Sequence, residues 1–204
     1  MSFYRNVALP RLCHLSMRNK NLIPYRQRLI GAAAGRVLEI GAGSGLNLPL
    51  YGPAAQEILA LEPTAPLIDM ARHAPHRPDL FVEFLDASAE AIPLDDESVD
   101  TVVTSWTLCT IPQATMALAE MRRVLRPGGR LLFVEHGLAP DEGVRWLQDR
   151  LTPAWRLISG GCHLNRPIRS MIEGTGFRMD RLETGYMSGP KPMTFMYEGS
   201  ARPA

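Results

Sequence analysis

Residues 37–45 read Val37-Leu38-Glu39-Ile40-Gly41-Ala42-Gly43-Ser44-Gly45, an apolar run that passes directly into three alternating glycines. A short apolar run of this kind predicts a buried strand, and the glycines predict a tight turn after it. Glycines also let the backbone approach a ligand at the carboxyl edge of the sheet, where open α/β folds bind their ligands. The stretch therefore predicts a ligand-binding turn.

The glycine spacing departs from the dinucleotide-binding fingerprint. A GxGxxG pattern that begins at Gly41 needs glycine at position 46, where this chain has Leu46. This difference weakens the interpretation as a nicotinamide-dependent oxidoreductase without eliminating it. A nucleoside-binding module without catalysis also stays open.

Apolar runs of strand length alternate with stretches of helical period along the rest of the chain. Strands are predicted at residues 36–40, 57–61, 80–85, 99–104 and 130–135. Two further strands, at 177–184 and 193–198, are joined by a turn-rich segment without a helix, which predicts an antiparallel final strand. The expected fold is a single-domain α/β protein with a doubly wound, seven-stranded, mostly parallel sheet and helices on both faces.

Two helices are indicated by apolar stripes. Leu118, Met121 and Leu125 share one stripe, and the Pro127-Gly128-Gly129 sequence is expected to stop that helix. A second helix is predicted where apolar residues recur every three or four positions. Its stripe consists of Val144, Leu147, Leu151, Trp155 and Ile158.

Composition limits the organisation and the partners. A chain of 204 residues, 46% of them hydrophobic, can bury one core. We therefore expect one domain at residues 35–204, preceded by an N-terminal arm at residues 1–34. The net charge of +1 gives no indication of a nucleic-acid partner. Because no apolar run approaches the roughly 18 residues of a membrane span, we expect no transmembrane segment and a cytoplasmic protein.

Polar residues follow the next predicted strands at the same sheet edge. Glu62 closes the second strand, where a carboxylate can accept hydrogen bonds from both hydroxyls of a ribose. Asp86 and Ala87 follow the third strand and are placed to meet the polar edge of an adenine. Thr104 ends the fourth strand, and residues 104–107 are expected near the rest of the cofactor.

These motifs together resemble the class I S-adenosylmethionine-dependent methyltransferases. The resemblance covers residues 35–198 and rests on the E-x-G-x-G-x-G pattern at 39–45, on Glu62 and Asp86, on the Pro127-Gly128-Gly129 stop and on the final hairpin. It implies S-adenosylmethionine as cofactor, with Gly41 and Gly43 against its methionine and ribose parts. The cofactor-binding residues that we predict are Glu39, Gly41, Gly43, Gly45, Asn47, Glu62, Asp86, Ala87 and Thr104.

A narrower resemblance is to the alkyl-thiol methyltransferases of animals and their small relatives. It is carried by residues 45–48 (GLNL), 106–111 (WTLCTI), 133–137 (FVEHG) and 160–164 (GGCHL). This group implies a small apolar acceptor, with a thiol favoured and an amine or a lipid head group open. Its animal members have a hydrophobic N-terminal anchor, which we do not expect here.

A thiol acceptor reacts as the thiolate, so a nearby base would help the transfer. His136 and His163 lie in the segments of the narrower resemblance and are our candidate catalytic residues. A structural hydrogen-bonding role explains either one equally well, whereas His14 is expected at the surface. Cys109 and Cys162 could together bind a soft metal or metalloid, but without a local ligand motif we expect buried free cysteines and no metal.

The N-terminal arm is basic and partly apolar. All seven charged residues before Glu39 are basic, and apolar residues such as Leu12 and Leu15 lie among them. Two interpretations are open: a helical lid over the cofactor or a peripheral membrane contact. Pro10 and Pro24 interrupt any long amphipathic helix, which favours the lid.

Overall fold

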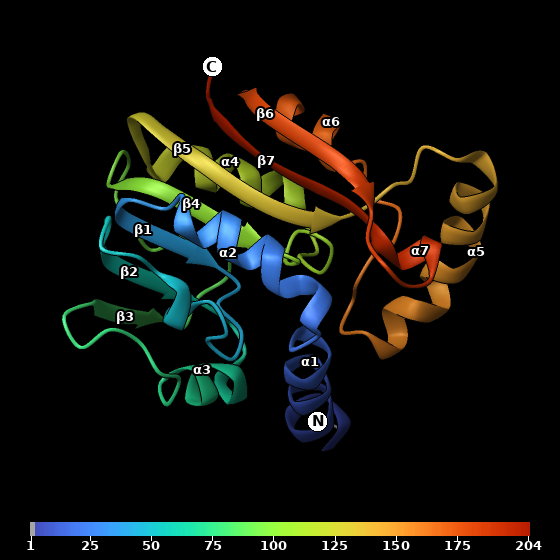
Figure 1. The fold of residues 1–204 in the computed structure, drawn as a ribbon, viewed down its shortest axis with the longest axis horizontal. Helices are drawn as coiled ribbons and strands as arrows, with labels where there is room; N and C mark the ends of the chain where they lie inside the picture. The colour runs from blue at the N-terminus through green and yellow to red at the C-terminus, as the bar shows by residue number, and fades with distance from the viewer. Residues whose placement is uncertain (1–2) are drawn as a thin grey trace.

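A seven-stranded sheet in the order β3-β2-β1-β4-β5-β7-β6 forms the centre of the computed structural model, which describes residues 3–204 (Figure 1). Strands β1 to β5 run parallel to one another, and β7 is antiparallel to both β5 and β6. The predicted antiparallel final strand is therefore confirmed, but the expectation of no helix before it is wrong, because the short helix α7 (Lys191–Thr194) lies between β6 and β7. The strands are β1 (Gly35–Ile40), β2 (Ala55–Leu61), β3 (Phe81–Leu85), β4 (Val99–Ser105), β5 (Leu125–His136), β6 (Phe177–Tyr186) and β7 (Phe195–Pro203).

Helices cover both faces of the sheet, as predicted. Leu38 and Ile40 of β1 belong to a core shared with α4 and α6, whereas Val37 belongs to a second core shared with α2. Figure 1 shows α2 across one face and α4 and α6 behind the other. The helices are η1 (Tyr4–Ala8), α1 (Leu9–Met17), η2 (Lys20–Leu22), α2 (Ile23–Gly31), η3 (Leu48–Leu50), α3 (Ala65–Ala71), α4 (Ala114–Val124), α5 (Glu142–Ile158), α6 (Ile168–Gly174) and α7 (Lys191–Thr194).

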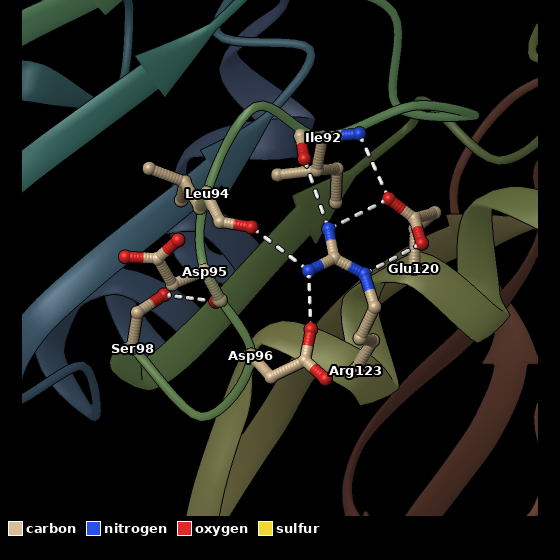
Figure 2. Close-up of polar contacts among 7 residues, drawn as sticks. All are labelled: Ile92, Leu94, Asp95, Asp96, Ser98, Glu120 and Arg123. Atoms are coloured by element: carbon tan, nitrogen blue, oxygen red, sulfur yellow. Dashed lines mark hydrogen bonds and ion pairs between the residues drawn. The ribbon is translucent and has the colours of Figure 1, made fainter.

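The end of α4 is joined to the loop before β4 by one guanidinium group. Arg123 forms a paired contact with Glu120 and an ion pair with Asp96, at 2.7 Å each. Its remaining N–H groups donate to the carbonyls of Ile92 and Leu94 at 2.9 and 2.8 Å (Figure 2). The helix ends at Val124, so Leu125, which was expected on its stripe, is the first residue of β5, and Pro127-Gly128-Gly129 lies within that strand.

Helix α5 forms where its stripe predicts a helix, but only part of the stripe is buried, namely Val144, with Trp155 packed against a buried cluster. Leu147, Leu151 and Ile158 are 40%, 42% and 60% exposed, whereas Gln148 and Thr152 are buried. Gln148 accepts a hydrogen bond from the N–H of Ala139 and donates to three backbone carbonyls between residues 137 and 192. These bonds satisfy buried backbone groups, so the polar face of α5 is turned inward.

Candidate functional site

The turn after β1 depends on glycines in the left-handed region. Gly41 and Gly43 have φ of +66° and +57°, which side chains of L-residues rarely adopt. A Cβ added at Gly41 would lie 2.4 Å from the side chain of Thr107, so glycine is needed there for packing. At Gly43 an added Cβ would contact only the carbonyl of Gly41, at 3.9 Å. Gly43 therefore keeps space open above the turn.

A cavity of about 230 Å³ lies between this turn and helix α1. Its floor is the glycine turn, its sides are the residues that follow β2 and β4, and α1 forms the opposite wall. Residues 159 and 160, after α5, also contribute to the lining. The lining is formed by Leu9, Pro10, Cys13, His14, Met17, Arg26, Gly41, Ala42, Gly43, Ser44, Leu46, Asn47, Glu62, Thr64, Leu67, Ser105, Trp106, Thr107, Thr110, Ser159 and Gly160.

Glu62 lies at the end of β2 with its carboxylate buried at the edge of this cavity. Its two oxygens accept hydrogen bonds from the backbone N–H groups of Gly43 and Thr64, both at 3.0 Å. Burial raises the pKa of Glu62, and the nearby charge of Asp86 acts in the same direction. A carboxylate has about four lone-pair positions, so this group can still accept hydrogen bonds from hydroxyls in the cavity.

A buried polar layer supports the turn from below. The amide nitrogen of Asn47 donates to Glu39 at 2.7 Å and to Ser105 at 3.1 Å, and its oxygen accepts from Arg26. Tyr51 donates to the other oxygen of Glu39 at 2.9 Å. Glu39 is 1% exposed, and burial raises the pKa of Glu39. Asn47 lines the cavity, whereas Glu39 lies beneath it.

The loop after β4 is held in place by a second buried carboxylate. Glu135 accepts hydrogen bonds from the hydroxyl of Thr104 at 2.8 Å and from the N–H groups of Thr107 and Leu108. Burial raises the pKa of Glu135 to about 7. Trp106 has an unusual positive φ of +52°, and the guanidinium of Arg26 lies 4.9 Å from its ring centroid. These contacts direct Trp106 and Thr107 to the cavity.

Helix α1 contributes an apolar wall and one histidine. The Nδ1 atom of His14 lies 2.7 Å from the hydroxyl of Ser44 in the glycine turn. His14 is half-buried and lines the cavity, so it has a role at the site that the expectation of a surface residue did not include. Its contact depends on how α1 folds back over the turn, and no local motif in the sequence indicates that position.

The predicted cofactor residues divide into two groups. Gly41, Gly43, Asn47 and Glu62 line the cavity. Glu39 and Thr104 are buried behind it, Gly45 packs beside α3, and Asp86 and Ala87 follow β3 at the adjacent sheet edge. Their roles stay predictions.

The two predicted catalytic histidines lie behind the cavity wall. The Nε2 atom of His136 is 3.3 Å from the sulfur of Cys162, and Nδ1 of His163 is 3.1 Å from the carbonyl of Cys109. Contacts with Cys109 and His136 lower the pKa of Cys162, whereas burial lowers the pKa of His163. Cys109 and Cys162 are buried and free, as expected.

Comparisons with known proteins agree with this geometry. A family model described as a methyltransferase domain matches residues 38–133. A thiol S-methyltransferase of Rattus norvegicus is 34% identical over 72% of this chain and 62% of its own length. A thiol S-methyltransferase of Homo sapiens is 32% identical over 83% of this chain and 71% of its own length. The chain thus spans about two thirds of the length of these relatives.

Solved structures agree on the fold. An S-adenosylmethionine-dependent methyltransferase from Mesorhizobium loti superposes with a TM-score of 0.66 at 17% identity, over 91% of this chain and 99% of that chain. An identity this low is informative about the fold alone.

Proposed function

Because this chain belongs to the class I S-adenosylmethionine-dependent methyltransferases, we propose that it methylates a small apolar thiol. The observation that supports a thiol acceptor is that the two relatives described above, from Rattus norvegicus and Homo sapiens, are both thiol S-methyltransferases. The cavity supports a small apolar acceptor, because α1 presents Leu9, Pro10 and Met17 opposite the glycine turn. Neither an oxidoreductase nor a binding module is favoured by the comparisons.

The cavity fits the cofactor of this family at two positions. The open space above Gly43 allows close approach of a ligand to the backbone, and Glu62 offers acceptor oxygens for ribose hydroxyls. Asp86 and Ala87 follow β3. Asp86 lies near Glu62, because its charge raises the pKa of that carboxylate. We therefore retain them in the proposal as the adenine contacts.

The chain has a limited chemical task in this reaction. When bound, S-adenosylmethionine supplies a methyl group that is already electrophilic. The protein must hold the acceptor sulfur in line with that group, and the acceptor must lose its proton as the new bond forms. His14 lines the cavity and is placed to take part, while His136 and His163 would act from behind the wall. We therefore include variants of all three histidines in the methyl-transfer assay described below.

We also propose that α1 is the lid of this site. The cavity of about 230 Å³ is smaller than the roughly 300–1,000 Å³ that is usual for small-molecule sites, and outward movement of α1, which forms one wall, would enlarge it. Polar contacts hold α1 and the segment before it in the closed position: His14 with Ser44, Arg26 with the carbonyl of Met17, and the hydroxyl of Tyr4 with the carbonyl of Ile158. Closure of this kind excludes water before transfer.

A peripheral membrane contact through the arm stays a second proposal. Leu12 and Leu15 of α1 are 54% and 63% exposed beside basic residues. Within residues 3–204, none of the helices is long and apolar enough to cross a membrane. Sedimentation with anionic vesicles tests the membrane contact. The double variant Leu12→Ser/Leu15→Ser should show less salt-sensitive binding to the vesicles than the unaltered protein does. Equal binding by the variant and the unaltered protein would contradict the contact.

Methyl transfer from labelled S-adenosylmethionine to matched acceptors tests the proposed function. We expect methylation of small alkyl thiols, with much slower transfer to alkyl amines and lipid head groups of similar size. His14→Ala, His136→Ala and His163→Ala are compared across pH to identify a base. Faster methyl transfer to the amine or the lipid head group than to the thiol would contradict the proposal that the acceptor is a thiol. Binding of NADH instead of S-adenosylhomocysteine would contradict the family assignment.

A further inference from the structure

Three soft ligand atoms converge behind the cavity wall. The sulfurs of Cys109 and Cys162 and one ring nitrogen of His136 all lie within 4.8 Å of one another. They come from three distant segments: the loop after β4, the end of β5 and the loop after α5. Cys109 and Cys162 are candidate soft-metal ligands from the sequence alone, but because these segments are far apart in the sequence, no spacing motif indicates that His136 joins them.

The distances are close to those of a tetrahedral metal centre. With zinc–sulfur bonds of about 2.3 Å and zinc–nitrogen bonds of about 2.0 Å, neighbouring ligand atoms lie roughly 3.5–3.8 Å apart. The sulfur of Cys162 is already 3.3 Å from Nε2 of His136, and the other pairs lie within 4.8 Å. Shifts of about 1 Å or less, within the range of side-chain rotation, would complete the geometry.

The cluster of Cys109, Cys162 and His136 is surrounded by apolar side chains, which shield an ion bound there from water. Leu164 is buried in the same cluster, and Trp155 and Met193 pack against it. The Nε2 atom of His136 faces the sulfur of Cys162 at 3.3 Å, and this is the ring nitrogen that a metal ion in the cluster would contact. The Nδ1 atom on the other side of the ring is buried and makes no hydrogen bond among residues 3–204.

We propose that Cys109, Cys162 and His136 form a binding site for a soft divalent cation of the Zn²⁺ class. Thiolate and imidazole are the ligands that this class prefers, and two cysteines with one histidine leave the fourth tetrahedral position open. The expectation from sequence was that no metal binds. The proposal does not depend on the identity of the methyl acceptor.

Cobalt titration of the full-length, reduced and metal-stripped protein tests the site. Co²⁺ serves as the probe because tetrahedral thiolate coordination gives visible d–d bands and a near-ultraviolet charge-transfer band. We expect both bands to saturate at one equivalent and to disappear when Zn²⁺ is added. Cys109→Ser, Cys162→Ser and His136→Gln should lose them. Cys13→Ser, which changes the remaining cysteine outside the cluster, should retain them.

A second measurement uses the unaltered protein, so it does not depend on whether the variants fold. Zn²⁺ at about ten times its dissociation constant should slow alkylation of Cys109 and Cys162 roughly tenfold, while Cys13 reacts at its original rate. Peptide mass spectrometry measures each cysteine separately. Absence of both the cobalt bands and the protection would overturn the proposal. So would bands that survive in Cys109→Ser/Cys162→Ser, or a disulfide between this pair in place of protection.

Discussion

The carboxylate of Glu62 accepts a hydrogen bond from the backbone N–H of Gly43 at 3.0 Å, which connects the end of β2 to the turn after β1. The same carboxylate accepts from Thr64 at 3.0 Å. Since both donors are backbone groups, they fix the position of the carboxylate without neutralising its charge. The residue therefore shapes the turn and offers acceptors to the cavity at the same time.

Glu62→Gln is expected to weaken binding of S-adenosylhomocysteine. An amide has one acceptor oxygen, so it cannot serve both backbone donors and the ribose hydroxyls. Loss of hydrogen bonds to a charged group costs about 1.5–3 kcal/mol, which corresponds to a roughly 10- to 150-fold higher Kd. Calorimetric titration measures it. Glu57→Gln is the matched control on the same strand, because Glu57 pairs with Arg36 outside the cavity. Equal losses in both variants would contradict this role.

The affinity for S-adenosylhomocysteine should fall at low pH. Burial raises the pKa of Glu62 above the ordinary glutamate value, so the protonated form appears at a higher pH than it does for an exposed carboxyl. Affinity is then complete above the raised pKa and is lost as the pH falls through it. Titrations at successive pH values measure the decline. In Glu62→Gln the same decline should be absent; if it persists, another group is responsible.

Alanine at Gly43 and at Gly41 should have different effects. Both substitutions force an L-residue into the left-handed region, at a cost of about 1–2 kcal/mol. Gly41→Ala also creates the contact with Thr107, and overpacking adds roughly 1–3 kcal/mol. Gly43→Ala lacks that contact, but its methyl group enters the cavity. Urea unfolding should therefore show the larger loss for Gly41→Ala, and calorimetry should show weaker ligand binding for the stable Gly43→Ala. Identical stabilities would contradict the clash.

Most of the fold could be predicted from local patterns, because a strand that is covered on both faces consists of consecutive apolar residues. Each of the seven predicted strands overlaps a strand of the structure, and the hairpin correctly predicted the antiparallel β7, but β5 begins at Leu125 and β7 ends at Pro203, five residues beyond their predicted bounds of 130 and 198. Helix α5 shows the limit of this reasoning. Its apolar stripe is partly exposed because Gln148 satisfies backbone groups from distant segments, which periodicity does not encode.

The site could be predicted only where it follows strand ends. Glu62 and Asn47 line the cavity as expected, since the parallel sheet brings these loops to one edge. His14 was missed because its position depends on the path of α1 across the turn. The meeting of Cys109, Cys162 and His136 depends on three long-range connections, for which a single sequence contains no local signal.

Arg123→Gln should destabilise the protein more than an exposed arginine substitution. The change leaves the carbonyls of Ile92 and Leu94 without their donor, and it removes the contacts with Glu120 and Asp96 (Figure 2). We expect a loss of roughly 1–3 kcal/mol in the free energy of unfolding. Arg169→Gln is the control, since the exposed pair with Glu173 should contribute less than about 0.5 kcal/mol. Urea unfolding measures the stability of both variants. Equal losses of stability in Arg123→Gln and Arg169→Gln would contradict this prediction.

Asn47→Ala should reduce stability as well as ligand affinity. Asn47 separates two buried charged groups, accepting from Arg26 and donating to Glu39, so its removal leaves both without this partner. Loss of a hydrogen bond to a charged group costs about 1.5–3 kcal/mol, and Glu39 keeps its bond from Tyr51 while Arg26 keeps the carbonyl of Met17. Asn165→Ala is the matched control, because the exposed contact of Asn165 with Asp149 should have little effect. Urea unfolding and titration with S-adenosylhomocysteine distinguish the possible roles. Weaker binding at unchanged stability would mean that Asn47 only contacts the cofactor, whereas losses in both would establish that it positions the turn.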